Sequence, residues 1–233
     1  MSASPPEQAS ASSAAVSGSG RRGRDRHTRR RLPVDRRREE LIKVALELLS
    51  QDTPGNVSID DIASAAGASR ALVYHYFGSK QELYLAALRS AANDLSERVK
   101  PPQEGSYRHR LAVALMHYFD FVEEHAAGFA ALLRGGPAYS AGDVGDVIEG
   151  VRGLILRQLF ESMGVTDPSA TLRATLRGWI GAVETAGLDW LEHRDLPRDA
   201  LEGLFIDHLA SMLAAAAQHD PDLASLVARL GEN

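Results

Sequence analysis

The sequence predicts an all-α protein, with a small three-helix domain near the N-terminus and a larger helical domain after it. Three observations support this prediction. From Asp35 onward, apolar residues recur at intervals of three and four, which is the spacing of one buried helix face. No stretch alternates apolar and polar residues as a half-buried strand does. Glycine and proline residues divide the helical stretches into separate elements.

Residues 1–34 predict a disordered arm, because a segment rich first in Ser, Ala and Gly and then in Arg cannot bury a core. Residues 21–43 carry ten Arg and one Lys against four acidic residues. This local charge of +7 would attract a polyanion such as a phosphate backbone. One interpretation places Arg21 to Arg31 in a DNA minor groove or along phosphates. The alternative is an arm that is merely solvated.

The first two helices follow the arm. The first begins at Asp35 and ends before the breaker Thr53-Pro54-Gly55-Asn56. Ser58 then opens the second helix, with Asp61 in the place of the usual Glu of a capping box. The buried face of the first helix consists of Leu41, Ile42, Val44, Ala45, Leu48 and Leu49.

A tight turn between two short helices follows. Gly67 can adopt the left-handed conformation that such a turn requires, and Ser69 can cap the next helix. Ala63, four residues before the glycine, allows the helices to approach closely, and Val73, six residues after it, returns an apolar side chain to the junction. This is the spacing of a helix-turn-helix, so residues 35–80 predict a DNA-binding domain.

Gly78 ends the third helix, and Ser79 with Glu82 predicts a capping box for a connecting helix from Lys80 to Val99. Residues 81–233, with the connecting helix at 81–99, form the larger domain. Its other helices are expected at about 107–124, 126–134, 144–163, 169–193, 198–218 and 223–230. The buried stripe of the connecting helix is Leu83, Ala87, Leu88, Ala91 and Leu95.

Several classes of protein are excluded by composition. The longest apolar run, Met212 to Ala217, is far shorter than a membrane span, and no export signal is found, so a cytoplasmic protein without membrane contact is expected. The absence of cysteine excludes disulfides, zinc fingers and iron–sulfur clusters. No phosphate loop, dinucleotide fingerprint, G-x-S-x-G or H-E-x-x-H is present, so neither catalysis nor a cofactor is expected.

From Ser58 to Ser69 and from Tyr74 to Leu83, the sequence closely resembles the TetR family of bacterial transcriptional regulators, over about residues 41–88. The resemblance implies a homodimer, usually a repressor, that binds a pseudo-palindromic operator in double-stranded DNA. It also implies release when a small-molecule effector enters the larger domain. Two positions differ from the usual family pattern: Tyr76 stands in place of His, and Val73 in place of Leu.

The same resemblance implies a set of DNA-binding residues. Arg70 and Ala71 would read base edges, the first by two bonds to guanine and the second by touching a thymine methyl. The alternatives are a solvated Arg70 and tyrosines that pack beneath the helix, and Phe77 is assigned to the core. The implied phosphate contacts are Tyr74, Tyr76 and Lys80, with Ser58, Ser69 and His75 as weaker candidates.

In the family, the last two long helices form a four-helix bundle with those of a second subunit, and residues 169–193 and 198–218 match them. The first presents the small residues Gly178, Gly181, Ala182, Ala186 and Gly187. The second presents the stripe Leu201, Leu204, Phe205, Leu209, Met212, Leu213 and Ala216. For each of these residues the alternative is the core of its own subunit.

Candidates for a ligand pocket in the larger domain are aromatic or long apolar residues with a few polar groups. They are Met116, Phe119, Phe121, Phe129, Tyr139, Phe160, Trp179 and Glu184, with His117 or His125 as polar anchors. The alternative for each is ordinary core packing. His117, Asp120 and Glu124, and likewise Asp189 and His193, share helix faces that could touch a metal, but such sets arise by chance and no metal is expected.

Two other functions remain open from the sequence. The first is a DNA-binding protein of the same fold that senses no ligand. The second is an all-α ligand-binding or catalytic protein whose basic arm is incidental. The sequence does not identify the effector, the operator, the regulated genes or the sign of regulation.

Overall fold

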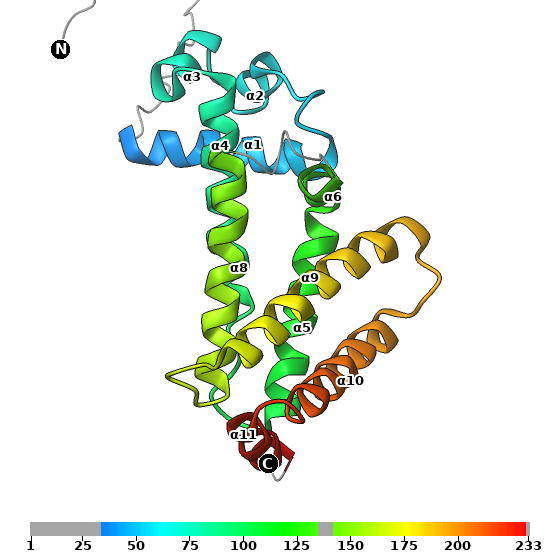
Figure 1. Ribbon diagram of the computed structural model, residues 1–233. Coiled ribbons are helices and arrows are strands. Elements are labelled where there is room, and N and C mark those ends of the chain that lie inside the picture. The colour runs from blue at the N-terminus through cyan, green and yellow to red at the C-terminus, as the bar shows by residue number, and fades with distance from the viewer. Residues whose placement is uncertain (1–33, 135–141, 232–233) are drawn as a thin grey trace, which may run out of the picture. The chain divides into compact units, whose positions relative to one another are not determined.

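The computed structural model describes residues 34–134 and 142–231, which contain helices and no strand (Figure 1). The all-α prediction is therefore confirmed for these residues. The arm from Arg21 to Arg31 and Tyr139 lie outside the described residues. The helices are α1 Val34–Gln51, α2 Ile59–Ala65, α3 Arg70–Phe77, α4 Lys80–Arg98, α5 Tyr107–Glu124, α6 Ala126–Arg134, α8 Asp143–Ser162, α9 Ala170–His193, α10 Arg198–Ala216 and α11 Pro221–Gly231.

The helices α2, α3 and α4 begin at the serine caps that the sequence indicates, namely Ser58, Ser69 and Ser79. Ser58 and Asp61 form a complete capping box, with Asp61 N–H donating to Ser58 Oγ at 3.2 Å and Ser58 N–H donating to Asp61 Oδ2 at 2.9 Å. At Ser79 the structure shows the bond from Glu82 N–H to the serine hydroxyl, at 3.1 Å. Each such cap stabilises its helix by about 1 kcal/mol, because it satisfies an otherwise unpaired backbone donor.

The last helix differs from expectation at its start. The sequence predicts its start at about residue 223, whereas Pro221 is the first residue of α11. Its missing N–H costs nothing there, since the first helical N–H groups have no partner within the helix. Asp220 caps this end by accepting from the backbone N–H groups of Asp222 at 3.1 Å and Leu223 at 3.2 Å.

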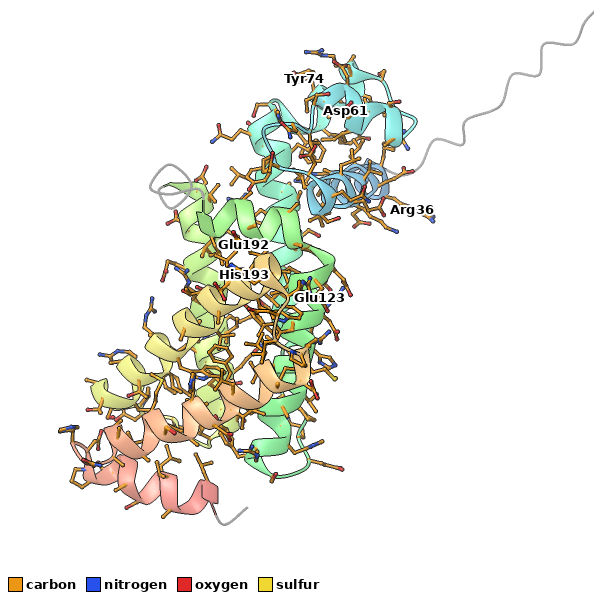
Figure 2. All side chains as sticks on the ribbon, turned by 90° about the vertical axis from the view of Figure 1, so that its right-hand side faces the viewer. Arg36, Asp61, Tyr74, Glu123, Glu192 and His193 are labelled. Carbon is orange, nitrogen blue, oxygen red and sulfur yellow. The ribbon has the colours of Figure 1, made fainter. Side chains whose placement is uncertain are left out.

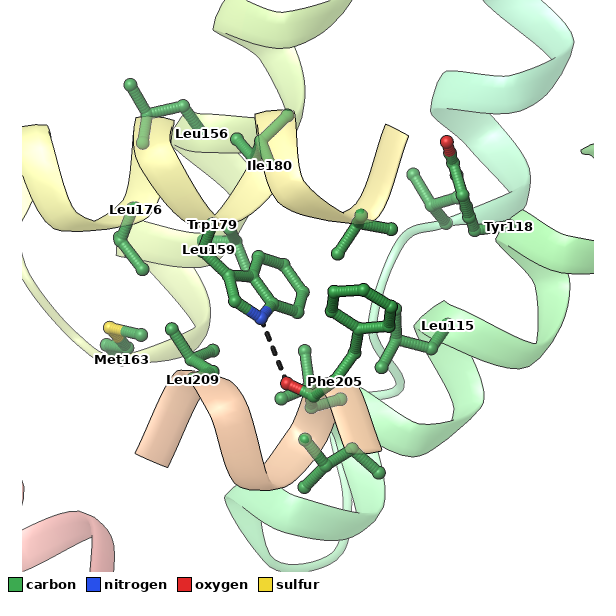
Figure 3. Close-up of a cluster of buried hydrophobic side chains, with 14 of the residues drawn as sticks. Leu115, Tyr118, Leu156, Leu159, Met163, Leu176, Trp179, Ile180, Phe205 and Leu209 are labelled. Carbon is green, nitrogen blue, oxygen red and sulfur yellow. Dashed lines mark hydrogen bonds between the residues drawn. The ribbon is translucent and has the colours of Figure 1, made fainter. Parts of the chain in front are cut away.

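Buried side chains form two clusters. The first, which we call the head core, joins α1, α2 and α3 to the start of α4 and contains Leu41, Val73 and Phe77. The second, the body core, joins the rest of α4 to α5, α8, α9, α10 and α11, and part of it surrounds Trp179 (Figure 3). The single helix α4 therefore belongs to both cores, with Leu83 and Ala87 in the first and Ala91, Leu95 and Val99 in the second.

No helix within residues 34–134 and 142–231 is both long and apolar enough to span a membrane.

Candidate nucleic-acid interface and interior cavities

The turn between α2 and α3 has the geometry of a helix-turn-helix. Gly67 lies at φ +57°, and the N–H of Ala68 donates to the carbonyl of Ala63 at 2.8 Å, which closes the turn. Ala63 and Val73 are buried where the two helices meet. The small side chain of Ala63 permits the close approach that the sequence predicts, and Val73 fills the junction.

The conformation of Gly67 leads to a stability prediction. Gly67→Ala is expected to lower the free energy of unfolding by about 1 to 2 kcal/mol, because an L-residue is strained at positive φ. A Cβ at this position would meet nothing within 4 Å, so the cost is conformational and not steric. Urea unfolding of the purified variant measures it.

Gly55→Ala provides the matched control. A Cβ at Gly55 would also meet nothing within 4 Å, and its φ is not in the left-handed region. This variant is expected to be neutral or slightly stabilising. Equal losses of stability in the two variants would show that backbone strain is not what Gly67 relieves.

The outward face of α3 presents polar side chains to solvent. Arg70, Ala71, Tyr74 and His75 are exposed, and so is Lys80 at the start of α4. Tyr74 is 38% exposed and lies on the outer side of α3 (Figure 2). The alternative in which Tyr74 packs beneath the helix is therefore wrong, whereas Phe77 is buried as expected.

Three other candidate DNA contacts are partly engaged within the chain. Tyr76 is half-buried and packs against the head core, with its ring edge-on to His75 at 5.5 Å between centroids. The hydroxyls of Ser58 and Ser69 each accept a backbone N–H as helix caps, at 3.2 Å in both cases. The Ser69 hydroxyl can still donate its own hydrogen, for example to a phosphate, whereas the Ser58 hydroxyl already donates to Asp61 Oδ2.

Arg70 is held by a residue that the sequence does not single out. Its Nη1 lies 2.7 Å from Oδ2 of Asp60 on α2, and its guanidinium lies 5.5 Å from the ring centroid of Tyr74. The Tyr74 hydroxyl and then the Asp60 carboxylate raise the pKa of Arg70. Since both side chains of the ion pair are more than half exposed, the pair contributes little stability and opens readily toward another partner.

The arginines at the start of α1, which contribute to the positive charge of residues 21–43, divide into two groups. Arg37 Nη2 donates to the carbonyls of Ala66 at 3.2 Å and Gly67 at 3.3 Å, so it caps the end of α2. Arg38 lies over the ring of Phe77, 5.0 Å from its centroid. These two arginines support the helix-turn-helix from within the chain, and Arg36 remains exposed (Figure 2).

Among the cavities lined by described residues, two adjoin each other in the larger domain. The first, of about 120 Å³ and partly open to solvent, is lined by α4, α5, α6 and α8, by Glu184 of α9, and by Leu46, Leu49 and Ser50 of α1. The second, of about 80 Å³, lies among α4, α5, α6, α8 and α9. Four residues line both cavities: Leu95, Phe129, Val151 and Glu184. Residues of α1 thus form one wall of the first cavity, and the same helix contributes to the head core.

Five of the ten candidate pocket residues line these cavities. Phe121, Phe129 and Glu184 line the first, together with His125. Trp179 lines the second, with Phe129 and Glu184.

Four of the described candidates line neither cavity, and the prediction is corrected for them. Met116 is 41% exposed, because α5 turns its side chain to solvent. The Nδ1 atom of His117 is 2.8 Å from the carbonyl oxygen of Arg98, outside both cavities. Phe160 is packed in the body core, as is Phe119. Residues on one helix face different neighbours, so residue type alone does not select the ones that face a cavity.

The polar groups at the cavities are few. Arg152 forms a forked ion pair with Glu184, with Nε 3.0 Å from Oε1 and Nη2 2.6 Å from Oε2, and hydrogen bonding to Glu184 raises the pKa of Arg152. Tyr118 Oη, His125 Nδ1 and Gln158 Oε1 are buried without a hydrogen-bond partner among the described residues. Burial raises the pKa of Tyr118 and lowers the pKa of His125, so both groups are neutral at pH 7.

The candidate metal residues have other partners. Asp120 pairs with Arg198 at 2.7 Å, and Glu124 pairs with Arg98 at 2.7 Å. His193 Nδ1 lies 3.4 Å from Asp189 Oδ1. Nowhere in the described part of the chain do three His, Asp or Glu side chains come together in a way that could hold a metal ion.

The faces of α9 and α10 are divided between core and surface. Leu201, Phe205, Leu209, Leu213 and Ala216 are buried in the body core, so the alternative of intramolecular packing holds for them. Gly187 faces inward as well, since a Cβ there would contact Phe119, Tyr118 and Phe129. The remaining candidates include Leu204, which is 43% exposed, and Gly178 and Ala182, which are exposed on α9.

Comparison with known proteins gives two family matches. Residues 41–87 match the model described as bacterial regulatory proteins, tetR family, and residues 107–212 match the model described as Tetracyclin repressor-like, C-terminal domain. A tetR-family transcriptional regulator from Streptomyces coelicolor has a solved structure that is 43% identical, with a TM-score of 0.82, and the match covers 85% of this chain and 90% of that one.

Two curated relatives are also similar. The transcriptional activator FasR of Mycolicibacterium smegmatis is 36% identical over 101 residues, which is 42% of this chain and 46% of FasR, so the chain matches less than half the length of that relative. The transcriptional regulator BetI of Brucella canis is 29% identical over 196 residues, 82% of this chain and 86% of BetI.

Proposed function

The chain belongs to the TetR family of bacterial transcriptional regulators, and on this premise we propose that it binds a pseudo-palindromic operator as a homodimer and is released by a small molecule. Repression is the proposed sign of regulation, although its relative FasR is named an activator. Residues 35–80 form the proposed DNA-binding domain and residues 81–233 the proposed ligand-binding and dimerisation domain. A regulator of chromosomal DNA acts in the cytoplasm.

The observation that carries the proposal is the outward face of α3. Buried Val73 and Phe77 fix this helix on the head core, so Arg70, Ala71 and Tyr74 point away from it. An exposed arginine and a small apolar residue at the start of a recognition helix suit guanine and thymine edges in the major groove. In a dimer the two recognition helices are expected about 34 to 36 Å apart, or a small multiple of that distance.

The position of the first cavity supports control by a ligand. A molecule held there would touch Leu46 and Leu49 of α1, which also belongs to the head core. The contact between α6 and α1 is close, since a Cβ on Gly128 would lie 3.1 Å from the carbonyl oxygen of Leu49. The effect on DNA binding can be no larger than the difference in the ligand's affinity for the two states.

These features favour the proposal over its two rivals. A DNA-binding protein that senses no ligand has no need of a cavity against its head. The matching family and the named relatives are transcriptional regulators and not enzymes, so we do not propose catalysis.

Selection of bound sites from a random DNA pool tests the proposal, with the enriched site then titrated at several salt concentrations. Arg70→Ala is expected to weaken the selected site by about 1 to 3 kcal/mol and to relax the preference at one base step. Lys80→Ala is expected to weaken all sequences alike and to reduce the salt slope by about 1.

Arg173→Ala removes an exposed arginine from α9 and is the control, with operator affinity expected to stay unchanged. No enriched site, or an Arg70→Ala variant that reads the same site as tightly as the original, would contradict base reading by α3. Enrichment of a site without two-fold symmetry would contradict the homodimer.

A further inference from the structure

We propose that the two interior cavities form one ligand site for a neutral, mainly apolar molecule that carries a hydrogen-bonding group, and that Phe129 separates its two compartments. The inference rests on the proposed function, in which the larger domain takes up a small molecule. It adds the chemical class of that molecule and the side chain that must move to admit it.

The two cavities are neighbours because they share walls. Leu95 of α4, Phe129 of α6, Val151 of α8 and Glu184 of α9 line both. Phe129 packs edge-on against Tyr118 of the second cavity, with 6.3 Å between ring centroids. A molecule longer than either compartment must displace the Phe129 ring to occupy both.

The walls favour an apolar molecule. The first cavity is lined mainly by leucine, valine, isoleucine, alanine and phenylalanine, and the second adds Trp179 to a similar set. Transfer of hydrocarbon from water to such walls is favourable in proportion to the area buried.

Among the described residues that line the two cavities, none offers a free charge to pair with a charged ligand. Glu184 is the acidic residue that lines both cavities, and Arg152 already binds both of its oxygens. His125 is uncharged at pH 7, because burial lowers its pKa. A carboxylate or ammonium group placed among these residues would be buried without a counter-ion, which is strongly unfavourable.

Three buried groups are available for a neutral polar group, two at the second cavity and His125 Nδ1 at the first. Tyr118 Oη and Gln158 Oε1 both belong to residues lining the second cavity, and neither has a hydrogen-bond partner among the described residues. The amide nitrogen of Gln158 donates to the carbonyl of Ser96 at 2.9 Å, which leaves its oxygen as an acceptor. A tyrosine hydroxyl that donates and an amide oxygen that accepts match a ligand hydroxyl or a similar neutral group.

Movement of Phe129 would reach the DNA-binding domain through its neighbour in the chain. Gly128 is the residue of α6 that lies against the backbone of α1 at Leu49. Because the two backbones are in close contact at this point, displacement of Phe129 is expected to shift α6 relative to α1. This gives a filled site a direct mechanical connection to the head core.

Probes of equal chain length test the class of ligand. Binding of 1-octanol, octanoate and octylammonium to the full-length protein without DNA is measured by calorimetry. Tryptophan fluorescence, to which Trp179 at the second cavity and Trp190 both contribute, provides a second signal. We expect 1-octanol to bind at least about tenfold more tightly than either charged probe, because only the charged probes lose hydration without compensation. Charged probes that bind as tightly as 1-octanol, or failure of all three to bind, would overturn the proposal.

Tyr118→Phe tests the hydrogen bond. It is expected to weaken 1-octanol binding about two- to tenfold, the range for loss of one hydrogen bond, without loss of thermal stability, since the hydroxyl has no partner to lose. Tyr107→Phe is the matched control, because Tyr107 also has a buried hydroxyl without a described partner but lines neither cavity. An unchanged affinity in Tyr118→Phe would overturn this part of the proposal.

Phe129→Ala tests the separation into two compartments. Joining them is expected to raise the ratio of the affinities for 1-dodecanol and 1-octanol, and a ratio cancels any general loss of stability. An unchanged ratio would show that Phe129 does not divide the site.

Operator release, measured separately by fluorescence anisotropy on the selected site, distinguishes the two levels of the proposal. If 1-octanol binds but the protein stays on the operator, the result supports the ligand site and contradicts the proposal that its ligand controls DNA binding. If only a charged molecule releases the protein from the operator, the result supports control by a small molecule and contradicts the proposal that this molecule is neutral.

Discussion

Leu204→Glu is expected to separate the homodimer into monomers and to lower the affinity for a two-site operator by about 10²- to 10⁴-fold, because linked half-site binding is lost. Leu204 is 43% exposed on the side of α10 that faces away from the body core. Helix α9 packs beside α10 (Figure 1). It exposes Gly178 and Ala182, whose small size permits close helix packing. In a two-fold interface the substitution would bring two unpaired carboxylates together.

Met116→Glu is the matched control for this prediction. Met116 is 41% exposed, a value close to that of Leu204, but it lies on α5. Sedimentation analysis of both variants, followed by operator titration, separates an effect of position from an effect of added charge. A Leu204→Glu protein that remains dimeric would show that α9 and α10 do not form the interface.

Trp179→Ala is expected to lower the free energy of unfolding by about 3 to 5 kcal/mol, the usual cost of removing a large aromatic side chain from a packed core. The indole lies among Leu159, Leu176, Phe205 and Leu209 (Figure 3). Its Nε1–H donates to the carbonyl of Phe205 at 2.9 Å, which joins α9 to α10. The substitution therefore removes both the packing and the bond that hold these two helices together.

Two further variants calibrate this measurement. Trp179→Phe keeps much of the buried area and is expected to lose less than Trp179→Ala, including about 0.5 to 1.5 kcal/mol for the hydrogen bond. Tyr74→Ala removes an exposed aromatic ring and is expected to change stability by no more than about 0.5 kcal/mol. If the free energy of unfolding of Trp179→Ala fell by less than about 1 kcal/mol, the surrounding residues would have to fill the space that the indole leaves.

The recognition surface follows closely from local sequence. The helix-turn-helix needs only a small residue at Ala63, a left-handed glycine at Gly67, a cap at Ser69 and an apolar side chain at Val73, and all four lie within eleven consecutive residues. Because the α3 helix is short, the burial of Val73 and Phe77 decides that Arg70 and Tyr74 face outward. Asp60 is missed, since its pairing with Arg70 crosses from one helix to the next and no spacing rule marks it.

The interior site is predicted less completely. Phe121, Phe129, Trp179 and Glu184 have the expected residue types and line a cavity, but Met116, His117 and Phe160 have equally suitable types and do not. Arg152, which pairs with Glu184 from 32 residues away, has no local signal. An isolated glycine at position 128 within an apolar helix is the one available sign that α6 approaches another backbone.

The sequence by itself determines the helices, their caps and the helix-turn-helix, because these depend on backbone bonds and side chains only a few residues apart. The tertiary structure decides what the charged and aromatic side chains do. It assigns Arg37 and Arg38 to the support of the turn, brings Leu46 and Leu49 of α1 into the wall of a cavity, and compensates Glu184 with Arg152. Those outcomes depend on which faces of distant helices meet, and the periodicity of a single helix contains no information about its neighbour.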